Sequence, residues 1–165
     1  MHLLRVLALS SLCATTIATS NYSSIVCFGD SFSDNGNGSY KITNRTWPAD
    51  PAYYDGRFSN GPVWIEHVAA NLSIPLHDYA FGGATTDNTL VEGYTGPNST
   101  ILVPGVAQQV ASFIDAGGSQ TAISSALFVV FGGFNDIFFN PNLTAAQVKT
   151  KIHMVYSISV KLCIR

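Results

Sequence analysis

The chain has 165 residues, of which 47% are hydrophobic and only 11% are charged. This length suits one domain with a sizeable core. Residues 21–148 contain ten acidic and three basic residues, which argues against nucleic acid as a partner, whereas residues 149–165 contain four basic residues and no acidic one. We therefore treat residues 149–165 as a divergent basic tail.

The N-terminus has the pattern of a secretory signal peptide. Arg5 precedes an apolar run over residues 6–17, and the small residues of 18–20 form a cleavage pattern. The apolar run is too short to span a bilayer comfortably. We expect cleavage after Ser20, no stable membrane anchor, and a secreted, extracellular protein.

Glycosylation sequons and cysteines agree with secretion. Asn-x-Ser/Thr sequons predict a glycoprotein, and we expect Asn37 to stay unmodified because it lies in the loop that also carries Ser31. The two cysteines beyond the signal, Cys27 and Cys163, make no disulfide framework. The six sequons begin at Asn21, Asn37, Asn44, Asn71, Asn98 and Asn142.

The first strand of the domain leads directly to a candidate nucleophile. Residues 25–28 are apolar and predict a short buried strand, after which Gly29, Asp30 and Ser31 turn the chain into a polar loop. Active sites of open α/β folds form at the C-terminal ends of strands. Ser31 is therefore our candidate nucleophile.

A long loop and a helix follow. Residues 38–61 are rich in turn formers and aromatic side chains, which either line a pocket or cap the core. Pro62 predicts the start of a helix whose apolar stripe begins at Trp64. His67 falls on the polar face of this helix, so we expect a solvated side chain there and not a catalytic base.

A second strand is predicted over residues 77–80, followed by Gly82 and Gly83. Two glycines after a strand permit close backbone approach and leave a backbone N–H free, although an ordinary tight turn is the alternative.

The third strand ends in a second candidate polar group. Residues 88–104 read as a polar loop and residues 105–116 as a helix, and the apolar run 126–131 predicts a central parallel strand covered on both faces. Asn135 follows this strand, where its amide either acts as a donor in a site or serves turn chemistry.

The chain then enters a third helix, with Thr144 and Gln147 as a capping box. Residues 157–164 alternate like a strand and are left unplaced. Three strands separated by helices predict right-handed crossovers and a parallel sheet. If the first strand lies between the other two, the loops of Ser31, Gly83 and Asn135 meet at one edge.

Three segments together resemble the signature blocks of the GDSL, or SGNH, esterases and lipases. They are residues 28–37, with Phe32 where that family has leucine, residues 78–85, and residues 133–136. The resemblance covers roughly residues 24–148. It implies a flavodoxin-like three-layer α/β/α fold whose C-terminal part is missing from this chain.

The resemblance also implies the roles of the candidate residues in a carboxylic ester hydrolase. Ser31 would be the nucleophile, and its backbone N–H, the N–H of Gly83 and the side-chain amide of Asn135 would form the oxyanion hole, with Gly82 as the fallback for Gly83. No cofactor and no metal are implied. Lipids, short esters and acetylated polysaccharides stay open as substrates, and the oligomeric state stays open as well.

The family takes its base from an Asp-x-x-His block, and no such block occurs in this sequence. We therefore expect a hydrolase domain that is truncated after residue 148 and inactive as given. One alternative is a non-catalytic remnant that binds carbohydrate or lipid. A weaker one is a phosphate or nucleotide binder that uses residues 29–38, because this loop holds Asp30 and Asp34 and no basic residue before Lys41.

Overall fold

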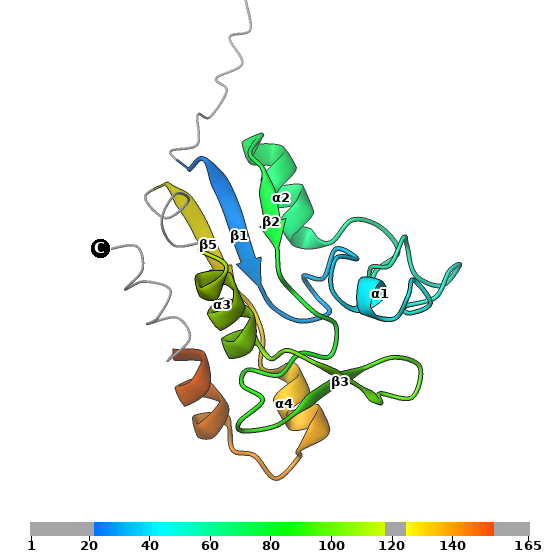
Figure 1. Ribbon diagram of the computed structural model, residues 1–165, viewed down its shortest axis with the longest axis vertical. Coiled ribbons are helices and arrows are strands. Elements are labelled where there is room, and N and C mark those ends of the chain that lie inside the picture. Colours follow the sequence, from blue (N-terminus) through cyan, green and yellow to red (C-terminus); the bar gives the residue numbers. More distant parts are fainter. Residues whose placement is uncertain (1–21, 118–124, 154–165) are drawn as a thin grey trace, which may run out of the picture.

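The computed structural model describes residues 22–117 and 125–153 (Figure 1). Its centre is a parallel sheet in the order β2 (Leu76–Asp78), β1 (Ser24–Phe28) and β5 (Ala126–Val130). Ile25 pairs with Leu76 on one side and with Leu127 on the other. The predicted order, with the first strand in the middle, is confirmed.

Helices cover both faces of this sheet. Alternate residues of β1 point to opposite faces, and all of them are buried. Val26 and Phe28 pack with α3 (Val106–Asp115) in one core cluster. Ile25 and Cys27 pack with α2 (Trp64–Leu72) in the other. The result is the expected three-layer α/β/α arrangement (Figure 1).

The predicted helices are present with small shifts at their ends. Helix α2 begins at Trp64 after its N-cap Val63, two residues later than Pro62. His67 is exposed, as predicted, whereas Trp64 is 42% exposed and lies outside the core stripe assigned to it. Its indole Nε1 instead donates a hydrogen bond to Ser33 Oγ at 3.1 Å, in the loop after β1.

Four short elements were missed in segments predicted as loops or turns. The segment 88–104 forms an antiparallel hairpin of β3 (Gly93–Thr95) and β4 (Ile101–Val103). Residues 38–61 contain the single-turn helix α1 (Ser39–Ile42), and α4 (Phe134–Phe139) follows β5. Each of these four elements is at most six residues long, too short for hydrophobic periodicity to mark it.

From β5 onward, the structure confirms some of the sequence predictions and not others. Among the described residues β5 pairs with β1 alone, and residues 127–130 are half-buried, so the expected central position is not seen there. Residues 145–153 are helical, and the predicted capping box is confirmed, because Thr144 N–H donates to Gln147 Oε1 and Gln147 N–H donates to Thr144 Oγ1.

The signal peptide and residues 157–164 lie outside the described residues. Within the described ranges no helix has the length and apolar character needed to cross a bilayer.

Candidate active site

The segments that carry the three candidate residues leave the sheet from adjacent points. At the end of β1, the carbonyl of Gly29 accepts a hydrogen bond from Phe81 N–H at 3.1 Å, and the carbonyl of Phe28 accepts one from Phe131 N–H at 3.0 Å. Phe81 extends β2 and Phe131 extends β5, so the sheet pairing continues past the strand ends. The carboxyl ends of three parallel strands therefore lie side by side, as binding sites of open α/β sheets require.

Neighbours of the candidate residues contact one another across these loops. Phe32, which follows Ser31, places its ring 5.7 Å from the ring of Phe134, which precedes Asn135. Asn135 Nδ2 donates a hydrogen bond to the carbonyl of Ala84, the residue after Gly83, at 2.8 Å. Residues from three distant segments thus gather at one edge of the sheet.

Ser31 lies in the turn after β1 and is half-buried. Its hydroxyl makes no hydrogen bond with any described residue, although hydroxyl groups of neighbouring serines do. A serine hydroxyl needs an adjacent base to become a good nucleophile. His67 and His77 are both exposed, on α2 and β2 respectively, and neither is hydrogen-bonded to Ser31 in the part of the chain that the structure describes.

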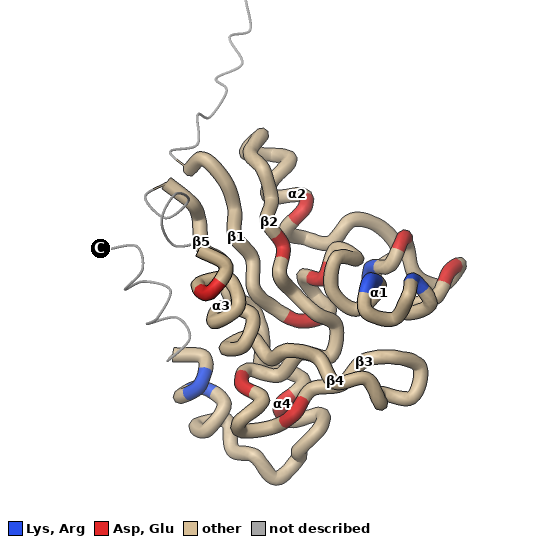
Figure 2. Tube along the Cα trace, in the orientation of Figure 1, with Lys and Arg blue, Asp and Glu red and all other residues tan. Residues whose placement is uncertain are grey.

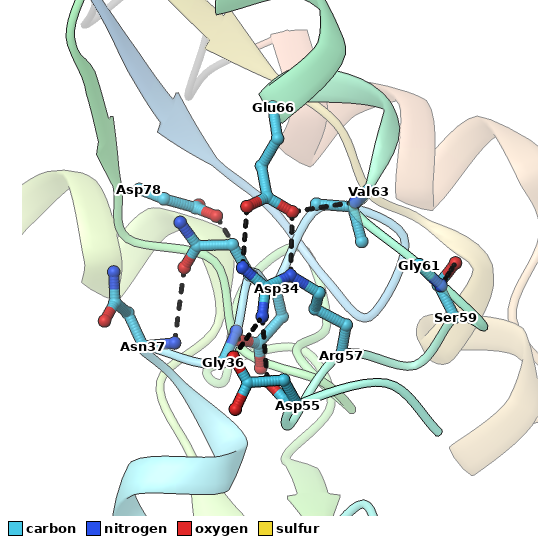
Figure 3. A network of polar contacts seen from close by, with 11 residues as sticks. Asp34, Gly36, Asn37, Asp55, Arg57, Ser59, Gly61, Val63, Glu66 and Asp78 are labelled. Carbon is cyan, nitrogen blue, oxygen red and sulfur yellow. Dashed lines mark hydrogen bonds and ion pairs between the residues drawn. The ribbon is translucent and has the colours of Figure 1, made fainter. Parts of the chain in front are cut away.

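The loop of Ser31 is organised by the buried carboxylate of Asp34, which Figure 3 shows beside one of its donors, Gly36. Its Oδ1 atom accepts hydrogen bonds from the backbone N–H groups of Gly36 and Gly38 at 3.0 and 3.1 Å. Its Oδ2 atom accepts hydrogen bonds from the N–H groups of Ser39 and Gly82, both at 2.8 Å. These four N–H donors satisfy a carboxyl group that would otherwise be costly to bury.

This network decides which glycine amide is available. Gly82 N–H is engaged by Asp34, and the Gly82 carbonyl accepts a hydrogen bond from Ser39 Oγ at 2.9 Å. Gly83 N–H has no acceptor among the described residues. Gly83 has φ +88°, and a Cβ atom there would collide with the carbonyl of Tyr94, so the position requires glycine.

Asn135 is held at the start of α4. Gly133, with φ +119°, lets the chain turn from β5 into this helix, and one Asn135 amide hydrogen is used by Ala84. The next residue, Asp136, is fully buried and accepts hydrogen bonds from both the backbone N–H and the hydroxyl of Thr86. The first turn of α4 is therefore fastened to the segment that follows Gly83.

Asp30, directly before Ser31, is a buried carboxyl group with a raised pKa. Burial, with the charge of Asp136 as a further contribution, raises the pKa of Asp30 to about 6. Its Oδ1 atom accepts the Phe32 N–H at 3.0 Å, while Oδ2 has no hydrogen-bond partner among the described residues. On α3, Gln109 holds the preceding residue, because its amide bonds both the N–H and the carbonyl of Gly29 at 2.9 Å.

Aromatic rings surround the loop of Ser31. The ring of Phe32 lies 5.7 Å from those of both Phe131 and Phe134, and Trp64 lies 6.2 Å from Phe131. All four side chains are at least 37% exposed. This edge of the sheet therefore presents an apolar surface on which the hydrocarbon part of a ligand could rest.

The comparison with protein families decides the identity of the fold. The profile of the GDSL-like lipase/acylhydrolase family matches residues 25–158. The chain belongs to this family. The α/β fold with the parallel sheet β2-β1-β5 is consistent with this membership.

Curated relatives agree with the membership. The chain is 33% identical to the thermolabile hemolysin of Vibrio parahaemolyticus over 127 residues, which cover 76% of this chain and 28% of that protein. It is 28% identical to an acetylesterase of Hypocrea jecorina over 133 residues, covering 76% and 38%. A phosphatidylcholine-sterol acyltransferase of Aeromonas hydrophila is 45% identical over 65 residues, covering 39% and 19%. The chain thus spans less than two-fifths of the length of these GDSL-like relatives.

Several residues that shape this GDSL-like site were not singled out from the sequence. Asp34 carried one signal, since an aspartate followed by glycines at +2 and +4 favours turns closed by its own side chain. Asp136 lies in the block 133–136, but its contact with Thr86, fifty positions away, could not be predicted from that block. Gln109 gave no signal, because it acts on Gly29, eighty positions away. Within the described ranges, no group of three or more His, Cys, Asp or Glu side chains could hold a metal ion.

Proposed function

We propose that this chain carries the nucleophile half of a secreted serine ester hydrolase. The observation that supports this most directly is the pattern of unused groups at one edge of the sheet. Ser31 Oγ, the N–H of Gly83 and one amide hydrogen of Asn135 are not engaged by described residues, while the groups beside them are. Preorganised donors beside a hydroxyl suit acyl transfer.

On this proposal, Ser31 Oγ attacks the ester carbonyl carbon and its proton passes to a base. The carbonyl oxygen becomes an oxyanion that accepts hydrogen bonds from the N–H groups of Ser31 and Gly83 and from Asn135 Nδ2. The C–O bond to the alcohol then breaks, the alcohol leaves with the proton, and an acyl-Ser31 ester remains. Water attacks this ester, releases the acid and regenerates the hydroxyl.

The base is missing from the sequence, since it contains no Asp-x-x-His block. We propose that residues 1–20 are a signal, that residues 21–148 are the N-terminal part of the hydrolase domain, and that this chain is nearly inactive alone. Donor groups and substrate binding still provide about 10³-fold acceleration over water in serine hydrolases that lack a triad member. Acylation of Ser31 should therefore be slow but measurable.

We propose that the substrate is a carboxylic ester, either a small ester or a lipid ester. The relatives include an acetylesterase and a phosphatidylcholine-sterol acyltransferase, so small esters and lipid esters are both supported. The exposed rings around Phe32 would contact the apolar part of either. Secretion is supported by the N-terminal signal pattern and by the sequons.

The test is covalent labelling of the complete chain with a fluorophosphonate, followed by peptide mass spectrometry. We expect one adduct, on Ser31, that forms faster when imidazole is added as an external base. Ser31→Ala should abolish the adduct, and Ser112→Ala, which removes an exposed hydroxyl on α3, should not. An adduct elsewhere, or none in the presence of imidazole, would refute the proposal, and binding of lipid or sugar without any adduct would favour a non-catalytic remnant.

A further inference from the structure

A polar hollow of about 610 Å³ lies beside the loop of Ser31. Its walls come from residues 35–37, from α1 with the turn after it, and from residues 55–57. Figure 3 shows Gly36, Asn37, Asp55 and Arg57 from this region, next to the Asp34 network. The candidate nucleophile does not line this hollow, so it is a separate feature of the molecule.

The basic residues of the domain line the hollow. Residues 22–148 contain three basic residues, Lys41, Arg45 and Arg57, and all three line it. The other described basic residues belong to the helix 145–153, on another part of the fold (Figure 2). Of the ten acidic residues in the chain, only Asp55 lines the hollow. Such a concentration of one sign in an acidic domain attracts anions.

Two of the three positive groups are unengaged. Arg57 forms a bidentate pair with Glu66, at 2.8 and 2.7 Å, and its Nη1 atom donates to the backbone carbonyl and the carboxylate of Asp55. The side chains of Lys41 and Arg45 form no hydrogen bond or ion pair with described residues. Arg57 is thus part of the wall, and Lys41 and Arg45 are the free ligands.

Backbone contacts fix the walls of the hollow. Gly36 has φ +93°, and a Cβ atom there would lie 3.0 Å from the carbonyl of Asp55, so the two walls approach as closely as glycine permits. Arg45 also has a left-handed φ, +63°, and its N–H donates to the carbonyl of Tyr40 at 2.8 Å. Non-glycine residues adopt this conformation at a cost, so the contacts around α1 hold Arg45 in place.

We infer that this hollow binds a phosphate-type oxyanion through Lys41 and Arg45. A guanidinium fork and a flexible ammonium group are the side chains that phosphate oxygens prefer, and the amide of Asn37 adds a neutral donor to the lining. The buried carboxylate of Asp34, which bonds Gly36 in the wall of the hollow, does not oppose the anion strongly, because four N–H groups surround it. Free phosphate and the phosphodiester of a lipid headgroup are the two sources of this chemistry. The inference does not depend on ester hydrolysis.

The experiment is a titration of the complete chain at low salt with inorganic phosphate and, separately, with glycerophosphocholine, followed by amide chemical shifts. We expect saturable shifts in residues 35–45 and 55–57. Lys41→Gln and Arg45→Gln should each weaken phosphate binding about tenfold, since each removes a charge-assisted hydrogen bond. Lys149→Gln removes the same charge from the helix 145–153 and should leave binding unchanged.

Saturable binding of phosphate without binding of glycerophosphocholine supports the site and assigns it to the free anion. Binding of glycerophosphocholine that is as tight as that of phosphate or tighter supports the site and assigns it to a lipid headgroup. Arg45→Lys, which keeps the charge but loses the fork, should bind with intermediate affinity. Absence of saturable shifts in these segments, or an equal loss of affinity in Lys149→Gln, would overturn the inference. Far-ultraviolet circular dichroism of each variant separates loss of the site from loss of the fold.

Discussion

Asp34 Oδ2 accepts a hydrogen bond from Gly82 N–H at 2.8 Å, and this contact joins the loop of Ser31 to the loop of Gly83. The two residues are 48 positions apart in the chain. Because Gly82 N–H is occupied, the neighbouring Gly83 N–H is the one left for a ligand. The buried carboxylate thus positions the donor that we propose for the oxyanion.

Replacing Asp34 with asparagine should destabilise the protein strongly. Asparagine has one acceptor oxygen, and its NH₂ group would face N–H donors that now point at Oδ2. We expect a loss of about 3 kcal/mol or more in the free energy of unfolding, since hydrogen bonds to a charged group contribute about 1.5–3 kcal/mol each. Urea denaturation measures this. Asp115→Asn, at the exposed end of α3, should change stability by less than about 0.5 kcal/mol, and equal effects would contradict our account of Asp34.

Gly83→Ala should lower both stability and labelling of Ser31. The positive φ and the nearby Tyr94 carbonyl leave no room for Cβ, so the backbone must move and its N–H must turn away. We expect a stability loss of about 2 kcal/mol and slower fluorophosphonate labelling. Gly61→Ala is the control, because a Cβ atom at Gly61 meets nothing within 4 Å. Unchanged labelling in Gly83→Ala would remove Gly83 from the proposed oxyanion hole.

The fold followed from the sequence where apolar runs or an amphipathic stripe mark an element. The buried run 25–28, the amphipathic stripe after Val63 and the apolar run 126–131 predicted the layers, and they predicted that Ser31, Gly83 and Asn135 follow strands at one edge of the sheet. Short elements were missed, because single turns such as α1 depend on contacts from elsewhere. Trp64 was assigned to the core from helical spacing, whereas its indole reaches Ser33 across the loop.

Asp30 should make the free energy of unfolding decrease as pH rises. Its pKa rises from 3.8 to about 6 on folding, so the native state binds more protons than the unfolded state between these values. Stability therefore decreases as pH rises from about 4 to 6. Asp30→Asn imitates the protonated form, so it should match the wild type near pH 4 and exceed it at pH 8, by on the order of 3 kcal/mol. Urea denaturation at both pH values checks this, and a variant that is less stable than the wild type at pH 8 would contradict it.

The pair of Arg57 and Glu66 should fix the long loop between α1 and α2. Both side chains are at most 20% exposed, and Glu66 Oε2 also accepts the N–H of Val63 at 2.8 Å. Arg57→Lys keeps the charge but loses the bidentate geometry, so we expect a loss of about 1 kcal/mol and faster proteolysis within residues 44–62. Arg45→Lys, at a side chain without an ion pair among the described residues, is the matched control. Equal proteolysis of the two variants would mean that the pair does not hold the loop.

On our proposal, Ser31, Gly83 and Asn135 act on one reacting atom. The rate of fluorophosphonate addition to Ser31, with imidazole present, tests it most directly when the wild type is compared with Asn135→Ala and with Asn60→Ala, which truncates an exposed asparagine. Loss of one oxyanion donor slows acyl transfer about 100-fold, so Asn135→Ala should react about 100-fold more slowly while Asn60→Ala matches the wild type. Equal rates in all three proteins would show that Asn135 does not serve the site of Ser31.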